Sequence, residues 1–263
     1  MNRLQVIFKK KSPRRKFFCA YVTMGFPRLK FTEQLIVALE KSGVDILELG
    51  IPFSDPLADG PVIQSSSFKA IQHGTRFEDA FRLVKKLRAK GVRFPIVFFS
   101  YYNPIFNYGL TRFSRRAQSA GFDAVLCPDL PPDEELLLPQ RVKQSGMDMI
   151  YLVAPTTSTQ RARKISRASG SFIYYVSTRG VTGMRKTLDH DLLFNIRRVQ
   201  KTVKQPVLVG FGVSSPEQVK KITHQADGVI VGSALIRWID QYRSVKKVAK
   251  RVESLVRSLK RAA

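Results

Sequence analysis

One stretch of the chain, residues 44–64 (VDILELGIPFSDPLADGPVIQ), contains acidic side chains that could move protons. Glu48 lies inside the apolar run DILELG, and strand alternation places it on the same face as Ile46 and Gly50. Burial among apolar neighbours raises the pKa of a carboxyl group, which suits it to proton transfer near neutral pH. A second interpretation stays open, in which Glu48 is a structural carboxylate paired with a neighbouring cation.

Two aspartates follow in the loop PFSDPLADGP. Asp55 and Asp59 alternate there with Pro52, Pro56 and Pro61, whose rings stiffen the backbone. Either aspartate could supply a second acid. Because turns are rich in Asp and Pro for conformational reasons, the pattern alone favours a turn role for both.

Three later segments have the composition of anion-binding loops. They are RGVTG (179–183), GFGVSSPEQ (210–218) and VGSALI (231–236), in which Gly232 and Ser233 open a helix. Glycines let backbone N–H groups approach an oxyanion, and the dipole at a helix N-terminus favours negative charge. The second and third segments occur in the order of the last two strand loops of a barrel, so they predict a phosphate site.

Eight short apolar runs separated by helical segments predict the strands that position these residues. Their near-continuous apolar character fits a parallel sheet covered on both faces, and eight units predict an α/β fold, a single (β/α)8 TIM barrel. An open doubly wound sheet is the alternative, weakened because TMGFP, not G-x-G-x-x-G, follows the first run. The predicted strands are residues 17–22, 45–49, 96–99, 124–127, 149–153, 172–176, 207–210 and 228–231.

Capping residues mark the predicted helix ends. Helix starts are predicted at Thr32, at Thr75 with Glu78 three residues later, and at Ser215, where Pro216 and Gln218 complete a capping box. An extra N-terminal helix (2–11) and a last helix (244–260) are additions to one domain, residues 1–263. Glycines predicted to stop helices are Gly43, Gly91, Gly121 and Gly146.

The chain is strongly basic, with 45 Lys and Arg residues, 20 Asp and Glu residues and a formal net charge of +25. Apart from a run at 9–16, the cations are scattered along predicted solvent faces of helices, and no nucleic-acid-reading motif accompanies them. The pattern therefore favours a solvated basic surface over nucleic-acid binding. Binding of nucleic acid or of a membrane surface through this exterior is the alternative.

Cysteine and histidine usage indicates neither a disulfide framework nor a metal site. Cys19 and Cys127 both lie in apolar runs and are predicted to be core residues, and the three histidines share no ligand spacing. No apolar stretch approaches the roughly 18 residues that a membrane helix needs, and no hydrophobic signal region is visible at the N-terminus. We therefore expect a cytoplasmic location and no membrane association.

The chain resembles tryptophan synthase α subunits in the sequence, order and spacing of six segments that cover nearly its whole length. The resemblance implies retro-aldol cleavage of indole-3-glycerol phosphate to indole and glyceraldehyde 3-phosphate, a carbon–carbon lyase reaction in tryptophan biosynthesis with no metal or organic cofactor. The six segments are ELGIPFSDPLADGPVIQ (48–64), SYYNP (100–104), CPDLPPDE (127–134), STRGVTG (177–183), GFGVSSPEQV (210–219) and VGSALI (231–236).

The resemblance also implies roles for individual residues. Glu48 matches the general acid/base, which protonates indole C3 and takes the proton of the adjacent glycerol hydroxyl. Asp59 matches the carboxylate that interacts with the indole N–H, and Thr182 the residue that hydrogen-bonds this aspartate when the site closes. The phosphate-binding positions are Gly183, Gly212, Gly232 and Ser233, and the indole-pocket positions are Tyr21, Phe99, Leu126, Tyr174, Phe211 and Ile230.

A partner is implied as well, because the family's α subunit docks on a pyridoxal-phosphate β subunit in an α2β2 heterotetramer and passes indole to it. Pro52, Asp55, Asn103 and Asn107 match the surfaces that contact this partner. A catalytically silent activator of the β subunit and a stand-alone lyase are the alternatives.

Two residues depart from the family pattern. Phe26 stands where relatives usually have Asp, and Arg179 stands where a smaller residue is expected. Neither departure removes a catalytic group, but both are expected to affect loop packing and closure.

Overall fold

Eight parallel strands close into a barrel in the order β1-β2-β3-β4-β5-β6-β7-β8, with β1 also paired to β8. The computed structural model describes residues 1–9, 15–176, 190–210 and 213–261. Closure confirms the predicted (β/α)8 fold, and the open-sheet alternative is wrong. The strands are β1 (Phe17–Thr23), β2 (Ile46–Gly50), β3 (Ile96–Phe99), β4 (Ala124–Leu126), β5 (Asp148–Val153), β6 (Ile173–Val176), β7 (Val207–Gly210) and β8 (Gly228–Val231).

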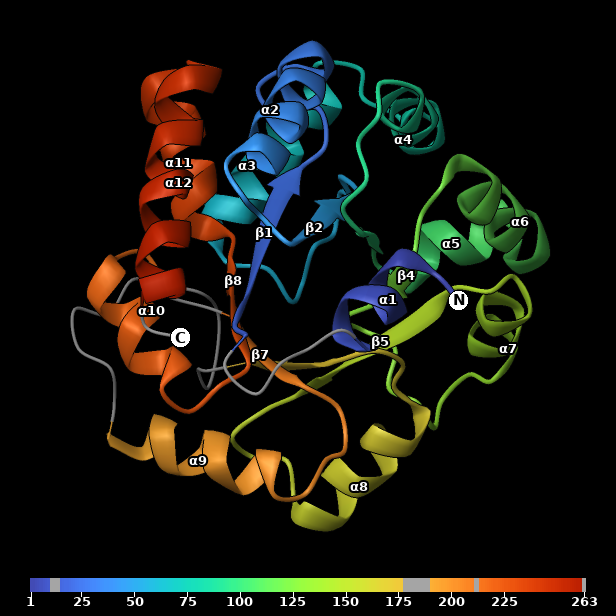
Figure 1. The fold of residues 1–263 in the computed structure, drawn as a ribbon. Coiled ribbons are helices and arrows are strands. Elements are labelled where there is room, and N and C mark those ends of the chain that lie inside the picture. Colours follow the sequence, from blue (N-terminus) through green and yellow to red (C-terminus); the bar gives the residue numbers. More distant parts are fainter. Residues whose placement is uncertain (10–14, 177–189, 211–212, 262–263) are drawn as a thin grey trace.

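Helices surround the strands (Figure 1). Each described strand is flanked by helices in sequence, which is why both faces of the sheet are apolar. The helices are α1 (Arg3–Lys9), α2 (Leu29–Lys41), α3 (Pro61–Gln72), α4 (Asp79–Ala89), α5 (Tyr102–Tyr108), α6 (Leu110–Ala120), α7 (Leu137–Gln144), α8 (Thr159–Ala168), α9 (His190–Gln200), α10 (Pro216–Thr223), α11 (Ser233–Tyr242) and α12 (Val245–Arg261).

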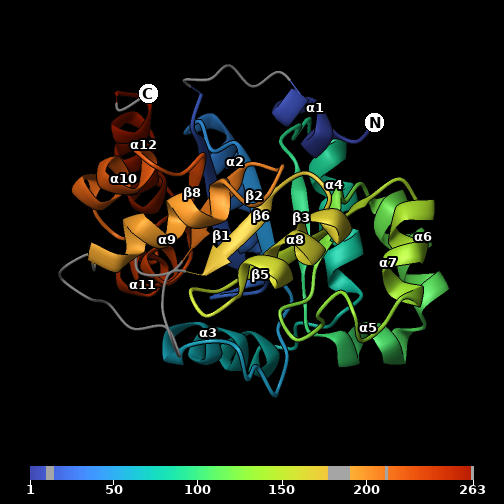
Figure 2. The same cartoon turned by 90° about the horizontal axis from the view of Figure 1, so that it is seen from below.

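The first helix covers one end of the barrel. Leu4 of α1 is fully buried, and the Phe8 ring lies 4.5 Å from the ring of Phe17, at the start of β1. Figure 2 shows α1 at the end opposite to α3 and α5, which follow the carboxyl ends of β2 and β3. The predicted extra N-terminal helix is confirmed, and it leaves the other end of the barrel for the site.

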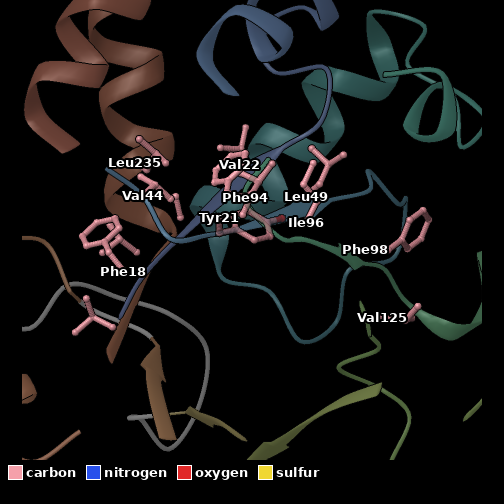
Figure 3. Close-up of a cluster of buried hydrophobic side chains, with 14 of the residues drawn as sticks. Phe18, Tyr21, Val22, Val44, Leu49, Phe94, Ile96, Phe98, Val125 and Leu235 are labelled. Atoms are coloured by element: carbon pink, nitrogen blue, oxygen red, sulfur yellow. The ribbon is translucent and has the colours of Figure 1, made fainter. Parts of the chain in front are cut away.

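Two buried clusters correspond to the two faces of the sheet. Cys19 and Ile46 belong to the cluster inside the barrel, whereas Val22 and Leu49 belong to the cluster between strands and helices. Figure 3 shows part of this outer cluster, including Leu235 of α11. The predicted alternation in DILELG is therefore correct, and it directs Glu48 inward with Ile46.

Two of the three predicted helix starts are wrong. Thr32 lies inside α2, which begins at Leu29, and its hydroxyl accepts a hydrogen bond from the Gly25 backbone N–H instead of capping the helix. The helix expected after Thr75 begins at Asp79, whose carboxylate accepts from the Arg76 N–H. At Thr32 the polar side chain binds a loop backbone group, an alternative to capping that residue type alone does not exclude.

The remaining local predictions hold. Ser215 caps α10 in a complete capping box with Gln218, and Pro216 occupies the first turn. All four glycines predicted to stop helices, Gly43, Gly91, Gly121 and Gly146, have φ between 77° and 100°.

Both cysteines are buried and unpaired, as predicted for core residues. Within the described residues, no cluster of His, Cys, Asp and Glu side chains is arranged to bind a metal. None of the helices in the described part of the chain is long and apolar enough to span a bilayer.

Candidate active site

Glu48 is a fully buried carboxyl on β2, paired in register with Tyr21 of β1. Among the described residues, neither carboxylate oxygen has a hydrogen-bond partner, and no cation forms an ion pair with it. Burial raises the pKa of Glu48 to about 8, and the nearby Cys19 thiol opposes this shift. The described residues thus do not support the interpretation of Glu48 as half of a structural ion pair, and the carboxyl can hold a proton at neutral pH.

Asp59 lies at the end of the loop between β2 and α3. Its backbone N–H donates to the Pro56 carbonyl at 3.0 Å, as in a turn, but its side chain accepts a hydrogen bond of 3.0 Å from the Tyr101 hydroxyl. Burial raises the pKa of Asp59 to about 6, and the Tyr101 hydrogen bond lowers it. The Asp59 backbone therefore forms a turn, while its carboxylate is fixed by the Tyr101 hydrogen bond. The carboxyl group is mainly ionised at pH 7.

Tyr101 was not predicted as a site residue. Its hydroxyl also accepts a hydrogen bond from the Ala58 N–H at 3.0 Å, so one side chain after β3 fixes the Asp59 loop at two points. Burial and the charge of Asp59 raise the pKa of Tyr101, which keeps its hydroxyl protonated as a donor. The only signal for it in the sequence was its place in SYYNP, directly after a predicted strand.

Glycines at two strand ends make room for two tyrosines. An added Cβ at Gly50 would lie 2.2 Å from the Tyr21 hydroxyl, and one at Gly210 would lie 2.3 Å from the Tyr174 hydroxyl. Each tyrosine thus crosses the carboxyl end of the neighbouring strand, toward the open end of the barrel. Burial raises the pKa values of Tyr21 and Tyr174, and the charges of Glu48 and Asp59 raise them further, so these groups share one electrostatic environment.

The predicted pocket residues gather at the same end. The ring of Tyr21 packs edge-on against the ring of Phe99, with centroids 5.4 Å apart. Leu126, Tyr174 and Ile230 belong to the cluster inside the barrel. Of the partly buried apolar residues packed on this cluster, three lie at or next to the carboxyl ends of strands and border the opening: Phe99, Leu152 and Val176, of which the last two were not predicted.

One of the three predicted anion loops is fully described. Gly232 is the N-cap of α11, and Ser233 is its first residue, so backbone N–H groups at this terminus lack helical acceptors. A Cβ at Gly232 would be 3.4 Å from Cβ of Tyr21, which places this terminus beside the aromatic pocket. Four other predicted site residues, Thr182, Gly183, Phe211 and Gly212, lie outside the described residues.

A protein-family model described as the tryptophan synthase alpha chain matches residues 8–263. The chain belongs to the tryptophan synthase alpha chain family. The alpha chain of Dehalococcoides mccartyi is 43% identical over 259 residues, covering 98% of this chain and 100% of the relative. That of Geotalea daltonii is 42% identical over 261 residues, covering 99% and 98%.

Solved structures agree with this assignment. Tryptophan synthase subunit alpha from Legionella pneumophila superposes with a TM-score of 0.89 at 35% identity, covering 100% of this chain and 98% of that one. A chain of Mycobacterium tuberculosis tryptophan synthase gives a TM-score of 0.89 at 33% identity, with 98% of each chain covered. The barrel and its open end are therefore those of tryptophan synthase alpha chains.

Members of this family normally pair with a β subunit, and four residues near the open end were predicted to contact such a partner. Asp55, Asn103 and Asn107 are exposed and Pro52 is partly buried. The Asn107 side-chain amide donates to the Asn103 side-chain oxygen at 3.0 Å, which links the two along α5. Between them in sequence, the aromatic side chain of Phe106 is 58% exposed.

Of the two residues that differ from the family pattern, Phe26 lies within the described part of the chain. Phe26 is buried, and the Lys69 ammonium of α3 lies over its ring, 5.5 Å from the centroid. An apolar ring thus joins the first loop to α3, the helix that follows Asp59. Arg179, the other departure, lies outside the described residues.

Proposed function

We propose that Glu48 and Asp59 are the catalytic carboxyl groups with which this chain cleaves indole-3-glycerol phosphate to indole and glyceraldehyde 3-phosphate. This lyase reaction is that of the tryptophan synthase alpha chain family, to which the chain belongs. The observation that carries the residue assignment is the fully buried, unpaired carboxyl of Glu48 at the open end of the barrel. Burial of an acid without a structural partner lowers the stability of the fold, so its presence in a cleft favours a catalytic role.

The two carboxyl groups differ in protonation near neutral pH. With pKa values of about 8 for Glu48 and about 6 for Asp59, the main form between these values has Glu48 protonated and Asp59 ionised. Protonated Glu48 can deliver its proton to indole C3. The resulting carboxylate can then accept the proton of the glycerol hydroxyl, whose electron pair forms the aldehyde as the carbon–carbon bond breaks and its electrons return to the ring.

Asp59 has a different part in this proposal. Protonation at C3 places positive charge on the indole nitrogen, and a fixed carboxylate near the N–H stabilises that charge. The hydrogen bond from Tyr101 holds the carboxylate in place without neutralising it. Thr182 is proposed to hydrogen-bond the same carboxylate on closure, as the family resemblance implies.

The substrate's two ends match two kinds of surface. The apolar residues Phe99, Leu126, Tyr174 and Ile230, with Tyr21, suit a planar indole ring. The phosphate is proposed to bind at Gly232 and Ser233 together with Gly183 and Gly212, where backbone N–H groups and the α11 dipole favour an anion. Phe211 is proposed to complete the pocket.

We further propose that the chain works in the cytoplasm as one barrel domain, residues 1–263, in an α2β2 heterotetramer. Support comes from the β1–β8 pairing that joins the two ends of the chain and from the family's normal pairing with a β subunit. Pro52, Asp55, Asn103 and Asn107 are proposed to contact that subunit.

An indole-release assay with and without the β subunit tests the function. We expect wild-type protein to release indole and Glu48→Gln to lose about 100-fold or more of this activity, because the amide cannot transfer the proton. The exposed residue Glu134 provides a control, Glu134→Gln, expected to keep full activity. No indole from the wild type in either condition would overturn the proposal. Stimulation of the β reaction without cleavage would identify a silent activator, and full activity alone a stand-alone lyase.

A further inference from the structure

Beneath Glu48 lies the buried apolar cluster inside the barrel. Within this cluster, Cys19 and Tyr174 are the residues that carry a thiol or hydroxyl group. Cys19 is on β1, two residues before Tyr21, the residue in register with Glu48. Side chains two residues apart on a strand share a face, so the thiol lies on the inner face directly below the level of the carboxyl.

Cys19 and Glu48 are both fully buried and interact. Neither carboxylate oxygen has a partner with full hydrogen-bond geometry among the described residues, and the thiol is the one polar group that lowers the pKa of Glu48. Burial and the Glu48 charge raise the pKa of Cys19 itself, so it stays an S–H group. An S–H group is a weak donor and cannot take over the carboxyl's proton.

We propose that Cys19 is a positioning residue for Glu48. Its S–H group acts as a weak hydrogen-bond donor to the carboxyl from the closed end of the barrel. This inference rests on the proposed role of Glu48. A stronger donor at this position would hold the carboxylate form, and an apolar side chain would leave it unsupported. A thiol lies between these extremes, and it leaves the carboxyl protonated but able to ionise during the reaction.

Among the described residues, few other ionisable groups interact with Cys19 and Glu48. Asp45, directly before β2, is one of them, and its charge also raises the pKa of Cys19. Tyr21 on β1 and Tyr174 on β6 stay protonated because burial raises their pKa values, and Asp59 contributes its charge from the loop after β2. On β3, the register partner of Glu48 is Val97, which is apolar. Changes at Cys19 therefore alter the floor below the carboxyl without replacing any of these groups.

The test is the pH dependence of kcat/KM for indole release in Cys19→Ser and Cys19→Val. We expect the alkaline limb, which reports loss of the Glu48 proton, to move to lower pH in Cys19→Ser and to higher pH in Cys19→Val. Each shift should be roughly half a unit to one unit, the size of one buried hydrogen bond. Cys127→Val is the matched control, because Cys127 is equally buried but belongs to the outer cluster, and its alkaline limb should not move.

A second measurement does not depend on turnover. The infrared carbonyl band of the protonated Glu48 carboxyl, identified by its absence in Glu48→Gln, should titrate in the same order, Ser below Cys below Val. Unmoved limbs and unmoved infrared titrations in both variants would overturn the positioning role while leaving the proposed function intact. Full activity in Glu48→Gln would instead overturn the proposed function, so the two failures are distinguishable.

Discussion

Two carboxyl groups near one barrel opening differ in proton affinity because their surroundings differ. Glu48 is fully buried, and among the described residues the Cys19 thiol is the group that lowers its pKa, whereas Asp59 is partly exposed and accepts a hydrogen bond from Tyr101. Desolvation raises both pKa values, to about 8 and about 6, and the hydrogen bond limits the second shift. We therefore expect a bell-shaped pH profile of kcat/KM with limbs near these values.

The burial of Glu48 has a consequence for stability. Its pKa is raised from 4.5 to about 8 in the folded state, so between these values only the unfolded chain loses the proton, and stability falls as pH rises. Glu48→Gln should therefore melt near the wild-type temperature at pH 4.5 and increasingly above it toward pH 8. The difference should grow by at most about 1.4 kcal/mol per pH unit. Thermal unfolding across this range tests it, and a constant difference would contradict it.

Tyr101→Phe removes one hydroxyl that serves two groups. Asp59 loses a donor to its carboxylate, so its pKa should rise and the acidic limb of kcat/KM should move to higher pH. We expect about a tenfold loss at pH 6.5, with partial recovery at pH 7.5. The alkaline limb belongs to Glu48 and should stay in place. Movement of both limbs would indicate a general disturbance of the barrel opening.

The direction of the Glu48 side chain was easier to predict from the sequence than its surroundings. Strand alternation predicted its inward direction, but whether a cation or a thiol lies beside it depends on strands distant in sequence. Asp59 looked like a turn residue because its backbone does form a turn, and the Tyr101 contact that distinguishes it spans 42 residues. Such contacts follow from barrel closure and not from local pattern.

At the scale of elements, the ends of strands shape the pocket. Gly50 ends β2 where the Tyr21 ring crosses it, so Gly50→Ala must displace the ring or the strand end. We expect kcat/KM to fall about tenfold and the protein to lose about 1–3 kcal/mol of stability, as overpacking typically causes. Steady-state kinetics and thermal unfolding measure both effects.

A double-mutant cycle with Tyr21→Ala identifies the cause. When the ring is absent, Gly50→Ala should cost little more, because nothing remains for its Cβ to meet. Additive losses in the double variant would mean that the glycine is needed for the backbone and not for the tyrosine.

Strands were easier to predict than helix starts. Every predicted strand is present within one residue at each end, because an apolar run bounded by polar residues has few other uses in a parallel barrel. Helix starts depend on single polar side chains: the Thr32 hydroxyl binds the Gly25 backbone instead, and the helix expected to start at Thr75 begins at Asp79. The start at Ser215 was predictable because three residues, Ser215, Pro216 and Gln218, all indicate the same helix N-terminus.

At the scale of the molecule, closure of the barrel separates a covered end from an open one. Figure 2 shows α1 at one end and α3 and α5 at the other. The exterior is strongly basic, with a formal net charge of +25, and many of its cations lie exposed on helices such as α12. Docking at the open end is therefore expected to strengthen at low salt if the partner surface is acidic.

The face proposed to contact the β subunit carries an exposed aromatic ring on α5. Phe106 of α5 is 58% exposed between Asn103 and Asn107, and aromatic side chains are enriched in protein–protein interfaces. Phe106→Ala should weaken association with the β subunit by about tenfold or more, roughly 1.4 kcal/mol, while the indole release of the isolated chain stays unchanged. Phe194→Ala is the matched control, because Phe194 is 69% exposed on α9, away from this face. Sedimentation velocity with the β subunit measures both, and equal weakening in the two variants would contradict a docking face at α5.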